Sequence, residues 1–213
     1  MIKPNSTILF QGDSITDCQR KREITEANGF HALGDGYCNL LAGRLLKERP
    51  RDNLKFYNRG ISGNRVVDLY ARWKTDAINL KPDIISILVG INDTWHEFGS
   101  QNGVEPERYK AVYEMMLSYT KEKLPKVQLI LCEPFALQCG VVTEEWMDEV
   151  CQRQQIVRQL AKDFSAVFAP FQSAINHVAI GTDPKHWLID GVHPTPAGHQ
   201  ILAECWYGTV IHN

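Results

Sequence analysis

Four short, turn-like segments of the 213-residue chain combine glycine with side chains that could take part in catalysis. They read GDSIT at 12–16, GISGN at 60–64, GIND at 90–93 and DGVHP at 190–194. Ser14 could act as a nucleophile, and His193 could take its proton. Asp190, three residues before His193, could orient the imidazole and stabilise its protonated form. These residue types predict a Ser-His-Asp triad.

Two further residues could stabilise the negative charge that forms when a hydroxyl attacks a carbonyl. Asn92 offers a side-chain amide, and Gly63 offers a backbone N–H that no side chain shields. With the backbone N–H of Ser14, they would supply three donors to an oxyanion. Each residue alone is more typical of a turn or a helix cap, so the prediction depends on their combination.

The elements that must position these segments alternate along the chain. Apolar runs that predict buried strands lie at 7–11, 54–58, 83–89, 127–132 and 166–168. Apolar residues at helical spacing predict helices at 37–48, 66–80, 109–124, 144–164 and from 196 to 206. The pattern places Met115 on the apolar face of the third helix, and Thr143 is expected to cap the fourth.

This alternation predicts an α/β fold, a three-layer α/β/α sandwich with a mostly parallel sheet, in a single domain spanning residues 1–213. The carboxyl ends of parallel strands meet at one edge, where such folds bind their ligands. Because the first three segments each follow a predicted strand, we expect the four segments to gather at that edge.

Composition and charge exclude several functional classes. The formal net charge is −2, and the densest basic group, Arg20-Lys21-Arg22, is too short for a binding stripe. We therefore expect no nucleic-acid or membrane partner. No apolar stretch approaches 18 residues and the start of the chain lacks a signal-peptide core, so we expect a cytoplasmic location. The six cysteines show no CxxC spacing, which favours reduced thiols.

A metal-dependent reaction is a weaker interpretation. Asp13, Asp17 and Asp93 could suggest a magnesium phosphatase. However, the spacing of Asp13 and Asp17 does not put two carboxylates at one strand end with a shared metal. No Walker phosphate loop and no GxGxxG motif is present either. We therefore expect neither a metal nor an organic cofactor.

Candidate substrate contacts lie beside the proposed triad. Trp95 follows GIND, and Trp187 precedes Asp190 by three residues, so either indole could line a carbohydrate subsite; Asp13 is a third candidate contact. Trp73 lies on an apolar helix face and is predicted to belong to the core. No long apolar insertion could form a lipase-like lid, which favours a short acyl group such as acetyl.

The four segments, in their order along the whole chain, resemble the sequence blocks of the SGNH (GDSL) hydrolases. The resemblance implies a flavodoxin-like five-stranded α/β/α sandwich, Ser14 as nucleophile and Asp190 and His193 as its partners. It also implies Gly63 and Asn92 as oxyanion donors. Three longer phrases, GDSITDC, NRGISGNRVVDLYARW and VGINDTWH, are similar to intracellular bacterial acetylxylan esterases, which deacetylate xylo-oligosaccharides. By analogy with related enzymes, a homo-oligomer is a possible partner state of this chain.

Two alternatives remain. The first is a thioesterase or lysophospholipase that uses the same triad on another acyl substrate. The second is a non-catalytic sugar-binding protein in which Ser14 only caps a helix. Acetate release from acetylated sugars separates the predicted esterase from the first, and covalent labelling of Ser14 by a fluorophosphonate excludes the second.

Overall fold

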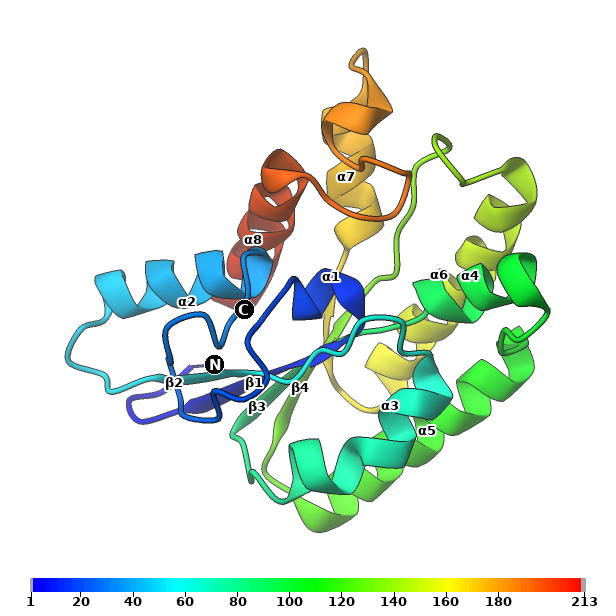
Figure 1. Cartoon of the computed structure of the whole chain (residues 1–213). Coiled ribbons are helices and arrows are strands. Elements are labelled where there is room, and N and C mark those ends of the chain that lie inside the picture. The colour runs from blue at the N-terminus through cyan, green and yellow to red at the C-terminus, as the bar shows by residue number, and fades with distance from the viewer. Residues whose placement is uncertain (1, 212–213) are drawn as a thin grey trace.

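The computed structural model describes residues 2–211 and contains a five-stranded sheet in which all neighbouring strands are parallel. Its strands are β1 (Thr7–Gly12), β2 (Lys55–Asn58), β3 (Ile84–Leu88), β4 (Gln128–Cys132) and β5 (Val167–Ala169). The strand order is β2-β1-β3-β4-β5, the flavodoxin-like order of doubly wound folds. The predicted fold class is therefore confirmed (Figure 1).

Helices cover both faces of this sheet (Figure 1). They are α1 (Ser14–Asp17), α2 (Tyr37–Glu48), α3 (Val66–Trp73), α4 (Ile91–Ser100), α5 (Pro106–Lys123), α6 (Glu144–Asp163), α7 (Phe171–Ala179) and α8 (Pro196–Ile211). The face that contacts α2, α7 and α8 forms one apolar cluster, and the face that contacts α3, α5 and most of α6 forms the other. Because the right-handed crossovers of parallel strands place helices on both faces, the central strands are shielded from water.

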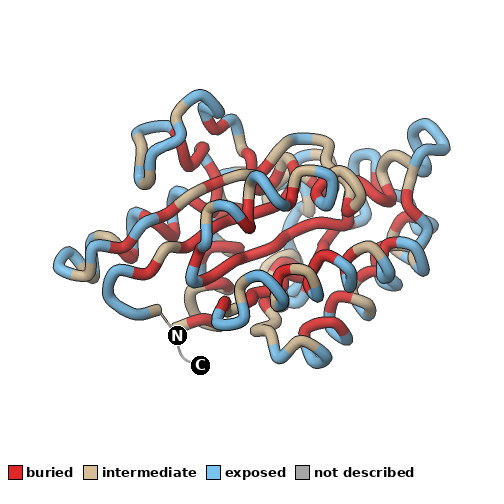
Figure 2. The backbone as a smooth tube through the Cα atoms, turned by 90° about the horizontal axis from the view of Figure 1, so that it is seen from below, coloured by how far each residue is buried: buried red, intermediate tan, exposed pale blue. Residues whose placement is uncertain are grey.

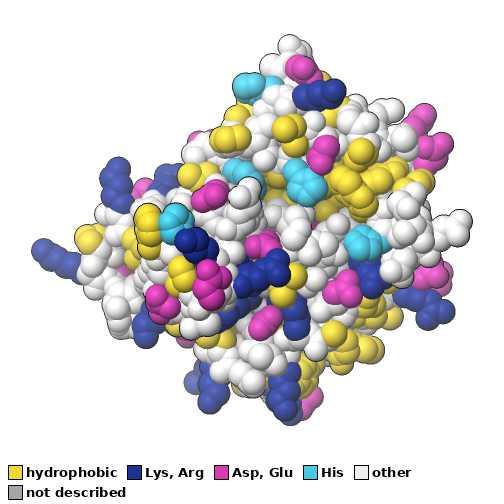
Figure 3. Space-filling view, viewed as in Figure 1, with side chains coloured by type: hydrophobic (Ala, Val, Ile, Leu, Met, Phe, Trp, Pro, Cys, Tyr) yellow, Lys and Arg dark blue, Asp and Glu magenta, His cyan; other side chains and the backbone are white. Residues whose placement is uncertain are grey.

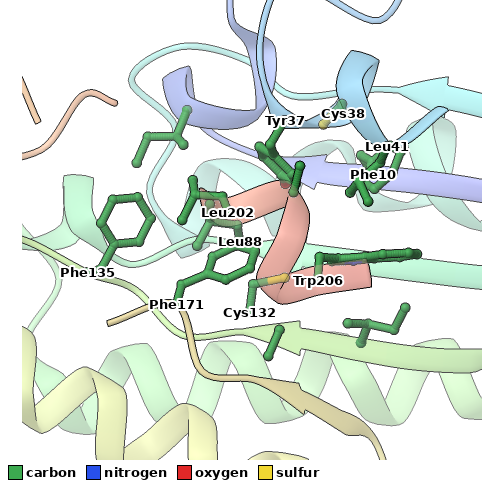
Figure 4. Close-up of a cluster of buried hydrophobic side chains, with 14 of the residues drawn as sticks. Phe10, Tyr37, Cys38, Leu41, Leu88, Cys132, Phe135, Phe171, Leu202 and Trp206 are labelled. Atoms are coloured by element: carbon green, nitrogen blue, oxygen red, sulfur yellow. The ribbon is translucent and has the colours of Figure 1, made fainter. Parts of the chain in front are cut away.

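The side chains of β1 show how the two clusters form. Ile8 and Phe10 point into the cluster of α2, α7 and α8, while Leu9 between them points into the opposite cluster. Figure 4 shows Phe10 packed near Tyr37 and Trp206 in the first cluster. The central strands are buried along their length (Figure 2), which accounts for their nearly continuous apolar sequences.

Several local predictions were wrong. The segment 66–80 is not one regular helix, because α3 ends at Trp73 and a π-helical turn, Lys74–Ile78, follows it. Thr143 precedes α6, but its hydroxyl donates to Glu145 instead of accepting a backbone N–H. GIND is a turn only at Gly90, since α4 begins at the next residue.

The core position predicted for Trp73 agrees with the structure. Trp73 is buried, and its indole N–H donates to the Thr120 hydroxyl at 2.7 Å, as suits a core residue. Within residues 2–211, none of the helices combines the length and the apolar character that crossing a membrane requires.

Candidate active site

The four glycine-containing segments lie around the carboxyl edge of the sheet. Ser14 is separated from β1 by Asp13 alone and is the first residue of α1. Gly63 lies in the turn between β2 and α3, and Asn92 lies in the first turn of α4, just after β3. The segment with Asp190 and His193 is a loop that leads into α8.

Ser14, His193 and Asp190 form a continuous hydrogen-bonded chain. The Oγ atom of Ser14 lies 2.9 Å from Nε2 of His193, and Nδ1 of His193 lies 2.7 Å from Oδ2 of Asp190. An ionised carboxylate can only accept, so it assigns the ring proton to Nδ1. Nε2 is then free to accept the proton of the Ser14 hydroxyl, which is the arrangement that general-base activation requires.

The backbone of the 190–193 loop fixes both partners of the serine. Oδ1 of Asp190 accepts the backbone N–H groups of Val192 at 3.0 Å and of His193 at 2.8 Å. Gly191 has φ +92°, and a Cβ there would lie 2.4 Å from the Cys139 carbonyl oxygen, so the tight turn requires glycine. Partial burial by itself raises the pKa of Asp190, but the hydrogen bonds from His193 and Val192 outweigh it and lower that pKa. The carboxylate therefore stays charged beside the imidazole.

Asp13 lies behind the nucleophile. It is fully buried, and its Oδ1 accepts the backbone N–H of Ile15 at 3.0 Å, so Asp13 caps α1 and Ser14 does not. Burial raises the pKa of Asp13 to about 7. With no exposed surface, this side chain gives no support to the predicted substrate contact.

The predicted oxyanion donors lie in adjoining turns. Nδ2 of Asn92 lies 3.3 Å from the carbonyl oxygen of Asn64, the residue after Gly63. That bond engages one amide hydrogen and leaves the other for a ligand. Gly63 has φ +83°, and no atom lies within 4 Å of where a Cβ would stand. The Gly63 turn therefore borders open space rather than packed protein.

Hydrogen bonds of two buried side chains, Asp17 and Asn58, hold the segment 60–64 beside α1. Asp17 accepts the backbone N–H of Ser62 at 2.9 Å through Oδ2. Asn58 donates to the Thr16 carbonyl at 2.6 Å and accepts the N–H of Gly60 at 2.9 Å. These bonds hold the turn that contains Gly63 against α1, so the positions of nucleophile and oxyanion donors depend on each other.

Three aromatic rings form a series of contacts that begins at His193. The Trp95 ring lies edge-on to the ring of His193 with centroids 5.6 Å apart, and Trp146 lies edge-on to Trp95 at 5.3 Å. Phe98 stacks on Trp146 at 5.5 Å. Hydrophobic side chains gather beside histidine on this face of the molecule (Figure 3). Trp95 thus lies where the sequence predicted, next to the triad.

Two of these rings were not recognised as site residues from the sequence. Trp146 fits the apolar face of α6, which predicts packing, and no motif distinguishes Phe98. Trp187, a predicted substrate contact, instead donates its indole N–H to Thr182 and lies edge-on to the His186 ring. No ring contact joins Trp187 to the triad within residues 2–211.

A cavity of about 460 Å³ adjoins the reactive atoms. Ser14 and His193 line one part of it, and Arg20, Arg22 and Ser62 line another. Across the described chain, no cluster of three or more His, Cys, Asp or Glu side chains could hold a metal ion. The chemistry that this arrangement supports by itself is attack of the Ser14 hydroxyl on an acyl carbon.

Known proteins with similar sequences and structures share this architecture. An acetylxylan esterase from Geobacillus stearothermophilus is 39% identical over 201 residues, which cover 93% of this chain and 91% of that protein. A protein of Parabacteroides merdae described as a GDSL-like lipase superposes with a TM-score of 0.96 at 39% identity, over 100% of this chain and 99% of that one. A crystal structure of the Geobacillus enzyme gives a TM-score of 0.90 at 36% identity, over 98% and 95% of the two chains.

Three crystal structures of the Geobacillus esterase are described as catalytic mutants, in which a serine, an aspartate or a histidine is replaced by alanine. These are the three residue types of the hydrogen-bonded chain found here. The sequence model of the GDSL-like lipase/acylhydrolase family matches residues 10–201, from the strand that precedes Ser14 to a point beyond His193. The chain belongs to the GDSL-like lipase/acylhydrolase family of ester hydrolases.

Proposed function

We propose that this chain is a serine esterase that removes acetyl groups from acetylated carbohydrates, with xylo-oligosaccharides as the leading substrates. The observation that carries the proposal is the chain of hydrogen bonds from Ser14 through His193 to Asp190, at 2.9 and 2.7 Å. The carbohydrate substrate is supported by the 39% identity to an acetylxylan esterase over most of both chains.

The reaction is acyl transfer in two halves. His193 takes the proton of Ser14 as Oγ attacks the acetyl carbonyl, and Asp190 stabilises the imidazolium that forms. The tetrahedral oxyanion accepts from the N–H groups of Ser14 and Gly63 and from the amide of Asn92. His193 then gives its proton to the departing sugar hydroxyl, and an acetyl-enzyme remains on Ser14.

Water completes the cycle. His193 removes a proton from the water that attacks the acetyl-enzyme, and the same oxyanion donors hold the second tetrahedral intermediate. When this intermediate collapses, acetate leaves and His193 returns the proton to Oγ of Ser14. The Trp95 ring beside His193 offers an apolar wall to a small acyl group.

An acetate-release assay tests the substrate class. We expect acetylated xylo-oligosaccharides to be deacetylated with a higher kcat/KM than the hydrolysis of long-chain nitrophenyl esters or acyl-CoA. A preference for acyl-CoA or for long acyl chains would overturn the carbohydrate proposal in favour of a thioesterase or lysophospholipase. Release of acetate from other acetylated glycans but not from xylo-oligosaccharides would overturn the choice of xylan.

Covalent labelling tests the nucleophile separately. A fluorophosphonate should add its mass to Ser14 of the native protein, and Ser14→Ala should abolish both the labelling and acetate release. Ser118→Ala, an exposed serine on α5, is the matched control and should behave as the native protein does. A native protein that neither reacts with the fluorophosphonate nor hydrolyses any ester would instead support a non-catalytic sugar-binding protein.

A cytoplasmic location is also part of the proposal. All six cysteines are free thiols, with Cys38 and Cys132 buried among apolar side chains. Reduced cysteines are typical of the cytoplasm. Fractionation of cells that express the protein would test this location, and recovery of the chain from the medium would contradict it.

A further inference from the structure

The cavity next to the triad has two arginines and one carboxylate, Asp17, in its lining, and the acyl-transfer mechanism does not use them. Ser14 and His193 line one part of the cavity, while Arg20 and Arg22 line another. Trp95 is not among its lining residues, so the cavity and the aromatic wall are separate features of the site. On the face shown in Figure 3, Lys and Arg side chains gather near the middle, with Asp and Glu side chains among them.

Arg20 is the unusual member of this cavity lining. The residue is only 7% exposed, yet its guanidinium makes a single hydrogen bond, from Nε to the Gly60 carbonyl at 2.8 Å. Neither Nη atom has a hydrogen-bond partner among residues 2–211. Among residues 2–211, no Arg20 atom belongs to the buried side-chain atoms that lack a partner, so both Nη groups are open to the solvent of the cavity. A ligand that accepts from both of them would gain charge-assisted hydrogen bonds.

The positive charge around Arg20 is only partly neutralised by the carboxylates of the described residues. Its one acidic neighbour, Asp17, lies 3.9 Å from Nε and is shared with Arg22 and with the backbone N–H of Ser62. Arg22, Arg59 and Arg72 add positive potential, and only Arg72 has its own acidic partner, Asp76, at 2.8 Å. Burial lowers the pKa of Arg20 to about 10; Asp17 opposes this shift and the neighbouring arginines add to it. The side chain therefore stays charged at neutral pH.

We propose that this basic pocket binds a carboxylate carried by the alcohol portion of the ester, as on an acetylated oligosaccharide that contains a uronic acid. The proposal rests on the proposed function, because it names the substrate that the esterase prefers. The two Nη groups of an arginine form a planar fork that matches a carboxylate, and the pair is charge-assisted. Neutral sugar hydroxyls could accept the same bonds but would leave the positive charge uncompensated.

The test compares acetylated xylo-oligosaccharides of equal length with and without a glucuronic acid substituent. The native enzyme should show a kcat/KM at least about 10-fold higher on the acidic substrate, through a lower KM. Arg20→Gln should bring the ratio of acidic to neutral kcat/KM close to one. Arg44→Gln, on the outer side of α2 and paired with Glu48, is the matched control and should keep the native ratio.

Two further measurements keep the proposal falsifiable if Arg20→Gln does not fold. Arg22→Gln changes a half-exposed side chain and should lower the acidic-to-neutral ratio severalfold. Raising NaCl from about 50 to 500 mM should lower the native ratio as well, because salt screens the attraction. A native ratio near one, or a ratio that none of these changes lowers, would overturn the proposal while leaving the esterase function intact.

A binding experiment separates this proposal from the choice of carbohydrate ester. Glucuronate should inhibit hydrolysis of p-nitrophenyl acetate by the native enzyme at concentrations where glucose does not, and Arg22→Gln should weaken that inhibition. This holds even if neither oligosaccharide releases acetate, a result that would overturn the proposed function alone. Equal effects of glucuronate and glucose would overturn the carboxylate pocket.

Discussion

Asp190 holds His193 by both its ring and its backbone. One carboxylate oxygen lies 2.7 Å from Nδ1, and the other accepts the backbone N–H of His193 at 2.8 Å. A single side chain thus fixes the loop through one oxygen and the imidazole through the other, and the ring cannot turn without losing its bond to Oδ2. Nε2 is thereby kept 2.9 Å from the Ser14 hydroxyl.

Replacing this carboxylate by an amide should cost most of the activity. In Asp190→Asn, the amide can still accept a backbone N–H, but its NH₂ group facing Nδ1 favours the wrong imidazole tautomer. We expect kcat to fall by about 10⁴ with the fold retained. Steady-state kinetics and circular dichroism measure the two quantities. Asp183→Asn, in an exposed turn, is the control, and a loss of less than tenfold in Asp190→Asn would contradict the triad.

Asn92 should act mainly in the transition state. Asn92→Ala removes one oxyanion donor, and we expect kcat to fall by about 10²–10³ with little change in KM. Hydrolysis of p-nitrophenyl acetate provides the measurement. Asn39→Ala, an exposed residue of α2, should leave kcat unchanged. An unchanged kcat in Asn92→Ala would remove Asn92 from the oxyanion site.

The aromatic wall should select for small acyl groups. Trp95→Leu removes the ring that contacts His193 and leaves space beside it, so kcat/KM for an acetyl ester should fall by about tenfold. The loss should be smaller for a butyryl ester, which can occupy the new space. Phe98→Leu alters a ring two contacts farther from His193 and should have a weaker effect. Equal losses on both esters would argue against a role in acyl selection.

Asp93 should make folding stability depend on pH. Burial, opposed by its hydrogen bond from Val66, raises the pKa of Asp93 to about 7, above the ordinary value of 3.8. The folded state therefore binds the proton more tightly, and this group contributes a loss of stability as pH rises from about 4 to 7. Asp93→Asn can still accept from Val66 and should gain stability relative to the native protein over that window, by a few kcal/mol.

Chemical unfolding at a series of pH values provides the test for Asp93. The difference in unfolding free energy between Asp93→Asn and the native protein should be smallest near pH 4 and level off above pH 7. If the difference does not change with pH, ionisation of the Asp93 carboxyl group does not destabilise the folded protein.

The strands and long helices could be predicted because burial on both sheet faces gives nearly continuous apolar runs. The helix at Tyr37–Glu48 has the predicted bounds. The buried face of α5 could be predicted only in part: Met115 is 49% exposed, whereas Thr120 is fully buried and its hydroxyl accepts the Trp73 indole N–H. The burial of Thr120 depends on Trp73, which lies 47 residues earlier in the chain, and the local spacing of apolar residues gives no information about that contact.

The candidate site shows the same division. Ser14 could be proposed from the sequence because it lies in a glycine-containing turn just after a strand, and Asp190 and His193 because they share one short glycine-containing turn before the last helix. Arg20 could not, since in the sequence it belongs to a short basic run that is typical of solvent-exposed surface. Only the folded chain shows its guanidinium nearly enclosed beside Gly60 and the reactive serine.

The separation of 179 residues between Ser14 and His193 has a consequence for biosynthesis. At about 5–20 residues per second, a ribosome adds the histidine roughly 10–35 s after the serine. During that interval β1 and α1 can emerge and fold, but the hydroxyl has no base. The nascent protein therefore cannot be catalytic until the loop that follows β5 and α7 has docked beside Ser14, so the onset of activity comes after the last strand of the sheet has been made.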